Sequence, residues 1–151
     1  MKKIYLSVVC LLISIPLIAQ LYVEPEKEVE CSVFLAKEGR GRAQQGLEMW
    51  DDYIFSCEDG GHVNIYDFKS ADPKPVAGFE LASSHPDNHV NNVCFGVETK
   101  RGASFPLLYI TNGKVGSELE WLCFVESITR RGKRFSSEIA QTIELDGSKW
   151  V

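Results

Sequence analysis

The feature that most constrains the fold of this chain is a series of four short β-type segments that occurs twice. In the first copy the segments cover residues 45–50, 53–57, 62–68 and 76–81. In the second copy they cover residues 89–97, 105–111, 119–126 and 139–145. Glycine, proline and acidic residues separate the segments, as is typical of turns between antiparallel strands. No segment after Gly39 has apolar residues at the 3.6-residue spacing of a helix, so the sequence predicts an all-β fold.

The two copies share their order and the pattern at their ends. Residues 78–81 read GFEL and residues 142–145 read TIEL. A four-stranded antiparallel unit repeated every 40 to 60 residues is typical of β-propeller blades. We therefore predict two blades, at about 42–81 and 89–145, and keep a small β-sandwich of the same eight strands as the alternative.

The length limits this prediction. A ring of only four blades, at about 40 residues each, needs about 160 residues, and the chain has 151. We therefore expect an incomplete propeller, an N-terminal fragment of a larger protein, with an open strand edge after Leu145. Such an edge would allow self-association.

The first 19 residues have the pattern of a secretory signal. Lys2 and Lys3 precede an almost unbroken apolar stretch at 4–18, and cleavage is expected after Ala19. An acidic lead-in at 20–41 follows. We expect an exported protein, in the periplasm or outside a Gram-negative-type bacterium, without a membrane segment after cleavage. An uncleaved anchor is the alternative.

The charge balance argues against one class of partner. The formal net charge is −5 and the sequence pI is near 5.2, so the surface repels phosphate backbones and we predict no nucleic-acid partner. Residues 130–134 (RRGKR) are the local exception. Their glycine, between two apolar runs, favours a solvated hairpin tip, and an anion-binding patch is the alternative.

One stretch of the second copy resembles a known family. In residues 85–96 (HPDNHVNNVCFG), His89, Asn91 and Phe95 match the His-x-Asn-x-x-x-Phe pattern that often opens the innermost strand of a blade. Residues 61–67 (GHVNIYD) are similar to the end of a third blade strand. The chain thus resembles secreted bacterial six-bladed β-propellers of the NHL/TolB-like type, although it has at most two of the six blades.

This resemblance implies where a ligand would bind. First strands line the central channel of such propellers, and ligand sites lie at its mouth. His89, Asn91 and Asn92 would then lie nearest the axis, with the loop at 83–88 on the rim. We take His89, Asn91, Asn92, Asp87 and Asn88 as candidate ligand-binding residues.

The same stretch allows two other interpretations. His85 and His89 are four residues apart, but Pro86 argues against the zinc-binding helix that this spacing suits, and a weak oxygen-rich cation site is the remaining metal alternative. The other interpretation is a structural turn in which Asp87 or Asn88 bonds its own backbone. We predict no metal.

No catalytic pattern is present in the sequence. It has no Gly-x-Ser-x-Gly elbow, and no glycine-rich loop that opens a helix. Asp51 and Asp52 fall at an expected turn. We therefore predict no cofactor and a non-catalytic binding or scaffolding role, with a small molecule, a glycan or a protein as the partner. The alternative is a fragment of a hydrolase or lactonase-type propeller enzyme.

Four cysteines would remain after export: Cys31, Cys57, Cys94 and Cys123. An oxidising compartment permits disulfides, and four thiols allow three pairings. Cys57, Cys94 and Cys123 lie inside expected strands, where cysteine is commonly a small buried apolar residue. The sequence leaves the pairing open.

Overall fold

The structure of the protein is a computed structural model that describes residues 43–72, 74–112 and 115–146. The chain divides into two units, Met1–Ser32 and Val33–Val151, and every described residue belongs to the second unit. The expected signal peptide at 1–19, the lead-in at 20–41 and Cys31 lie outside the described residues.

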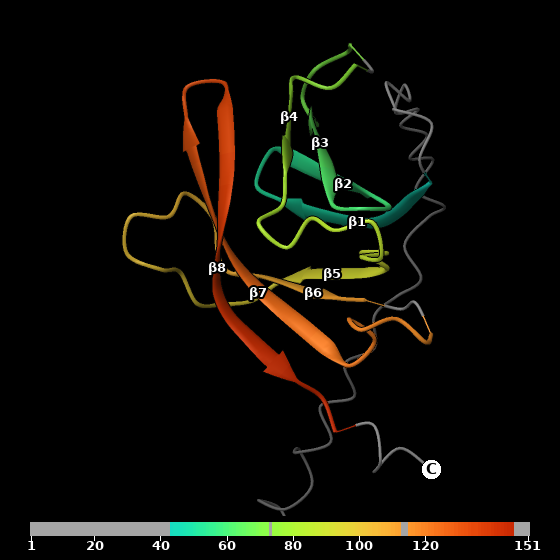
Figure 1. The fold of residues 1–151 in the computed structure, drawn as a ribbon. Coiled ribbons are helices and arrows are strands. Elements are labelled where there is room, and N and C mark those ends of the chain that lie inside the picture. Colours follow the sequence, from blue (N-terminus) through green and yellow to red (C-terminus); the bar gives the residue numbers. More distant parts are fainter. Residues whose placement is uncertain (1–42, 73, 113–114, 147–151) are drawn as a thin grey trace, which may run out of the picture. The chain divides into compact units, whose positions relative to one another are not determined.

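The described residues form eight strands and no helix, which confirms the all-β prediction (Figure 1). The strands are β1 (Gln44–Trp50), β2 (Tyr53–Glu58), β3 (His62–Asp67), β4 (Ala77–Glu80), β5 (Asn92–Phe95), β6 (Leu108–Thr111), β7 (Leu122–Arg131) and β8 (Arg134–Glu144). Within the described part of the chain, no helix is long and apolar enough to cross a membrane.

The strands form two antiparallel sheets in chain order, β1-β2-β3-β4 and β5-β6-β7-β8. This confirms the prediction of two four-stranded units. Strand β1 contacts β5, and strand β4 contacts β8. Each sheet is therefore a four-stranded meander, as in a propeller blade. Between the sheets, the two first strands are in contact and the two last strands are in contact. A small β-sandwich, the predicted alternative, is compatible with the same arrangement.

The turns of the first sheet follow from its residues. The β1–β2 turn lies at Asp51 and Asp52, as predicted, and Asp51 has a φ of 53°. The β2–β3 turn contains Gly60 and Gly61, with φ angles of 89° and 98°. A side-chain carbon on Gly61 would lie 2.8 Å from the Cα atom of Ser84, so both the backbone conformation and the space require glycine there.

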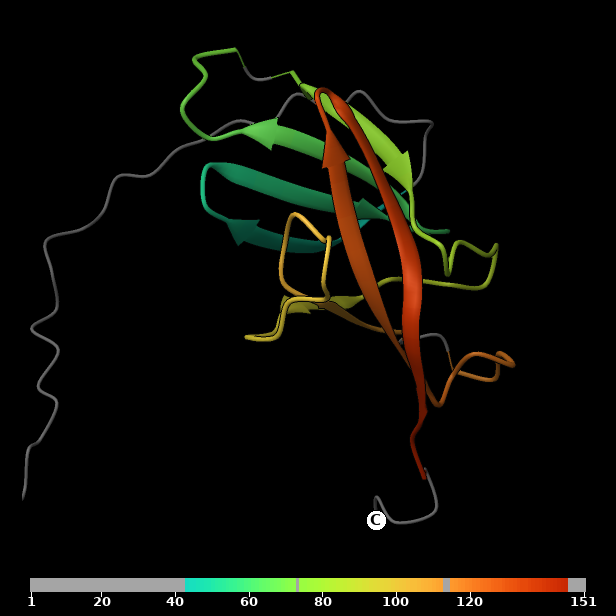
Figure 2. The same ribbon diagram turned by 90° about the vertical axis from the view of Figure 1, so that its left-hand side faces the viewer.

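The second sheet differs from the prediction at several boundaries, since β5, β6 and β7 each begin three residues later than predicted, at Asn92, Leu108 and Leu122. Strand β5 begins at Asn92 and not at 89, because Val90 has a φ of 46°, which turns the chain before the strand starts. Strand β7 continues to Arg131 and β8 begins at Arg134, so this hairpin is longer than predicted (Figure 2). The predicted hairpin tip at 130–134 is confirmed.

Aromatic side chains from both sheets fill the space between them. Phe55 of β2 is fully buried, and its ring lies 5.0 Å from that of Phe95 and 5.1 Å from that of Phe105, both edge-on. Phe135 of β8 stacks on Phe79 of β4 at 6.1 Å. Edge-to-face and offset-stacked pairs add to the burial of apolar area. The sheets are thus held together by one shared aromatic core.

Replacing Phe55 tests this core. Phe55→Ala should lower the free energy of unfolding by about 3 to 5 kcal/mol, because it removes a buried ring and leaves a cavity. The matched control is Phe68→Ala, whose ring is 45% exposed and should cost about 1 kcal/mol or less. Urea unfolding followed by circular dichroism measures both. Equal losses in the two variants would contradict the assignment of the core.

Candidate functional site

The loop at 81–91, called the rim loop below, joins β4 to β5. It carries four of the five predicted site residues, and the fifth, Asn92, begins β5. Glu126 of β7 is fully buried and fixes the start of this loop. Its Oε1 accepts a hydrogen bond from Ser83 N at 2.8 Å, and its Oε2 accepts one from Ala82 N at 3.0 Å. Bonds from backbone N–H groups to a carboxylate are charge-assisted and strong. Glu126 therefore ties the second sheet to the end of the first.

The other side of the loop is bonded to the β2–β3 turn. Gly60 N donates to Asn88 O at 2.7 Å, and His85 N donates to Gly60 O at 3.2 Å. Leu81 N donates to Gly61 O at 2.8 Å. The loop is therefore held between β7 and the β2–β3 turn, and the groups of the loop that form these bonds belong to its backbone.

Asn88 is an internal brace of the loop. It is fully buried, and its Nδ2 donates to Ser83 O at 2.9 Å. Its Oδ1 accepts a hydrogen bond from Val90 N at 3.1 Å, which is the turn predicted for this stretch, in which Asn88 bonds its own backbone. Val90 is β-branched and has a positive φ, a conformation that such residues rarely adopt. The amide of Asn88 thus stabilises a strained backbone and points into the loop.

His89 lies between the loop and two neighbouring turns. Its backbone N donates to Asn112 Oδ1 at 3.0 Å, and Asn112 Nδ2 donates to Ser117 Oγ at 2.9 Å. Its ring atom Nε2 lies 3.6 Å from Asp59 Oδ1, and about a third of each side chain is exposed. His89 and Asp59 therefore form a partly exposed polar pair, and the sequence did not predict the contribution of Asp59.

The remaining predicted residues have different surroundings. Asn91 is half-buried, and its Oδ1 is buried without a hydrogen bond. Asn92 is exposed at the start of β5, opposite Thr111. Asp87 is half-buried, and its backbone N donates to His85 Nδ1 at 3.1 Å. The structure thus brings His89 and Asn91 to the two sides of the strained Val90, and it leaves Asn92 facing outward.

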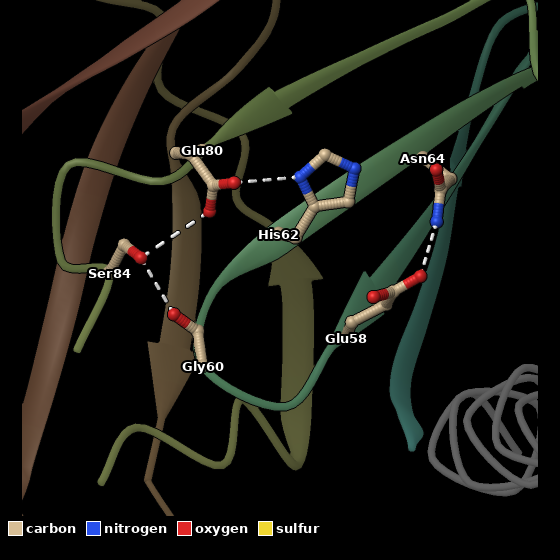
Figure 3. A network of polar contacts seen from close by, with 6 residues as sticks. All are labelled: Glu58, Gly60, His62, Asn64, Glu80 and Ser84. Carbon is tan, nitrogen blue, oxygen red and sulfur yellow. Dashed lines mark hydrogen bonds and ion pairs between the residues drawn. The ribbon is translucent and has the colours of Figure 1, made fainter. Parts of the chain in front are cut away.

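A second polar network, which sequence reasoning missed, lies where β3 begins and β4 ends (Figure 3). His62 and Glu80 are opposite each other in the sheet, and His62 Nδ1 lies 3.0 Å from Glu80 Oε1. Ser84 Oγ lies 2.7 Å from Gly60 O and 3.4 Å from Glu80 Oε2. Only the pairing register of two strands 18 residues apart brings His62 and Glu80 together. The glycine pair before His62 was the one signal in the sequence.

This network braces the loop. The Ser84 hydroxyl is closest to the Gly60 carbonyl, and the Glu80 carboxylate contacts both Ser84 and His62. In the described part of the chain, no group of three or more His, Cys, Asp and Glu side chains could hold a metal ion.

Glu58, at the end of β2, is a second fully buried carboxylate. Its Oε1 accepts a hydrogen bond from Asn64 Nδ2 at 2.8 Å (Figure 3), whereas its Oε2 is buried without one. A buried carboxylate with an unpaired oxygen is destabilising unless its other bonds are strong. The Asn64 bond is therefore the contact on which the burial of Glu58 depends.

The three cysteines among the described residues are free, and their environments differ. Burial raises the pKa of Cys57 to about 12, and the nearby carboxylates of Glu126 and Glu48 add to the effect. Burial is also the main cause that raises the pKa of Cys123. Cys94, on β5, is exposed. Two of the three thus fit the prediction of small buried apolar residues.

Comparison with known proteins adds little to this description. No family model matches the chain, and no curated protein sequence matches it. A solved structure described as "KlHsv2 with loop 6CD replaced by a Gly-Ser linker" is similar to it with a TM-score of 0.44 and 11% sequence identity. The match covers 70% of this chain and 31% of that chain.

Replacing Glu126 tests the tie between the sheets. Glu126→Gln should lower the free energy of unfolding by about 1 to 3 kcal/mol, because the amide turns a donor toward one of the two N–H groups. Glu138→Gln is the matched control, since its ion pair with Lys100 is exposed and should contribute less than about 1 kcal/mol. Urea unfolding at pH 7 measures both, and equal losses would contradict the role of Glu126.

Thiol labelling tests the cysteine environments. A raised pKa lowers the thiolate fraction at a given pH, and the thiolate is the reactive form. At pH 8 iodoacetamide should therefore modify Cys94 in the folded protein and modify Cys57 only after denaturation. Peptide mass spectrometry gives the rate at each cysteine. Similar rates at Cys57 and Cys94 before unfolding would show that the burial of Cys57 is wrong.

Proposed function

We propose that the protein is an exported, non-catalytic module of the β-propeller type that binds a partner at the rim loop. The observation that carries this proposal is the combination of a braced loop with a strained Val90. Backbone strain of this kind costs about 1 to 3 kcal/mol and persists where the surroundings enforce it, frequently at binding sites. Here the backbone conformation of Val90 sets the positions of its two neighbours, His89 and Asn91.

The polar atoms at this place indicate the chemistry of the partner. The side chains of His89 and Asp59 are each about a third exposed, so a ligand can reach the imidazole and the carboxylate, whereas Asn91 Oδ1 is buried. A carboxylate accepts hydrogen bonds, so a ligand with hydroxyl or amide N–H donors, such as a glycan or an extended peptide, fits better than an apolar molecule. The brace of Glu126 and Asn88 reduces the ordering cost of binding, because the loop is already fixed.

Arrays of neutral oligosaccharides and of peptides test the proposal. The wild-type protein should bind members of one array, and the double variant His89→Ala, Asn91→Ala should bind them about tenfold more weakly, because it removes the partly exposed ring and the side chain on the other side of the strained Val90. Gln141→Ala, on the exposed face of β8, is the control and should bind like the wild type. Circular dichroism verifies folding of each variant.

Two outcomes would contradict the proposal. Unchanged binding by the folded double variant would remove His89 and Asn91 from the site. Binding of neither array by the wild-type protein would remove the rim loop as a site for donor-rich ligands.

A further inference from the structure

The outer half of the β7–β8 hairpin has a continuous polar face, and none of its residues belongs to the rim loop. Alternate residues of paired strands point to the same face. The core face carries Ile128 and Phe135, with Ser137 and Arg130 opposite them. The opposite face carries three directly opposed pairs, which are Ser127 with Glu138, Thr129 with Ser136, and Arg131 with Arg134.

The arginine pair at the end of this face is unusual for its charge. Like charges directly opposite each other in a sheet are destabilising. Neither Arg131 nor Arg134 forms an ion pair with any described residue, although the whole chain has an excess of acidic side chains. Glu138, the carboxylate on the same face, is already paired with Lys100, with 2.8 Å between Nζ and Oε1. Two arginines are thus directly opposite each other in the ladder without an ion pair to the described residues.

The turn of the hairpin fixes this arginine pair. Only Gly132 and Lys133 connect the strands, and Gly132 has a φ of 65°, as the first position of a tight two-residue hairpin turn requires. The tip is visible as the orange-to-red turn in Figure 2. The backbone therefore keeps the two arginines in register at the end of the ladder.

A cavity of about 600 Å³ lies on this face. Its lining consists of Ser127, Thr129, Arg131, Arg134, Phe135, Ser136, Ser137 and Glu138. The hydroxyl groups of Ser127, Thr129 and Ser136 make no hydrogen bond to the described residues, so their protons are available as donors. The cavity therefore combines two uncompensated guanidinium groups with several free hydroxyl donors.

We infer that this cavity binds a tetrahedral oxyanion, the sulfate or phosphate ester group of a larger ligand. Guanidinium groups match such oxyanions with two parallel hydrogen bonds each. A sulfate or phosphate ester has three terminal oxygens, which can accept from both arginines and from the hydroxyls at once. From Cys123 to Arg131, strand β7 runs about 26 Å at about 3.3 Å per residue, so the arginine pair lies far from the Cys123 end of the strand. Ser137, at the other side of the cavity lining, accepts a hydrogen bond from Ala82 N of the rim loop at 2.8 Å.

Calorimetric titration of the full chain at low salt tests the inference, with glucose 6-sulfate, glucose 6-phosphate and glucose as probes. Both esters, or one of them, should bind, and glucose should not. The stronger of the two esters identifies the source of the oxyanion. The double variant Arg131→Gln, Arg134→Gln should bind the preferred ester about tenfold or more weakly, because it removes both charged partners.

Two matched variants separate a defined site from general attraction to a positive tip. Lys74→Gln with Lys133→Gln removes the same charge, but both residues line the neighbouring cavity, so the affinity should change less than about threefold. Thr129→Val with Ser136→Ala keeps the charge and should weaken binding about threefold to tenfold. The Arg131, Arg134 variant should melt no lower than the wild type, since it removes a repulsion.

The inference is overturned if glucose binds as well as the esters, or if neither ester binds. It is also overturned if the two charge-removing double variants lose equal affinity, because the tip would then attract anions without a defined site. None of these results bears on the rim loop, whose residues are unchanged in all three variants.

Discussion

The contact between the Glu126 carboxylate and two backbone N–H groups determines how the two sheets meet. A fully buried charge is stable in a protein only when strong hydrogen bonds replace the water that it has lost. Ala82 and Ser83 provide these bonds, and both stand at the start of the loop that crosses between the sheets. The position of His89 and Asn91 therefore depends on a residue that touches neither of them.

Much of the strand pattern could be predicted because it depends on local sequence. Alternation of apolar and polar residues, with glycine and acidic residues between the runs, is enough to place β2, β3 and the turn between them. The start of β5 was misplaced because Val90, a residue that favours strands, is turned by its contact with Asn88. The length of β7 and β8 was underestimated because residues 126–131 contain a single apolar residue, Ile128, so the apolar run ends at Val125.

The candidate site was less predictable, because its members meet through tertiary contacts. Glu126 follows an apolar run, and nothing in that run shows that its carboxylate receives two N–H groups. Asn88 and Asn91 are equivalent in a sequence, yet one is an internal brace and the other has an oxygen without a hydrogen bond. The pairing of His89 with Asp59 requires two turns to approach each other. Sequence reasoning thus found the segment of the site but not the roles within it.

The long β7–β8 hairpin belongs to both layers of the core. The half of the hairpin near Leu122 pairs with β6 in the second sheet, whereas Phe135, near the tip, stacks on Phe79 of the first sheet. Opening either sheet therefore breaks packing that the other sheet needs, even though no backbone ladder connects them. In thermodynamic language, the two ladders are coupled into a single cooperative unit, so that slow exchange of buried amide hydrogens extends across the boundary between the sheets.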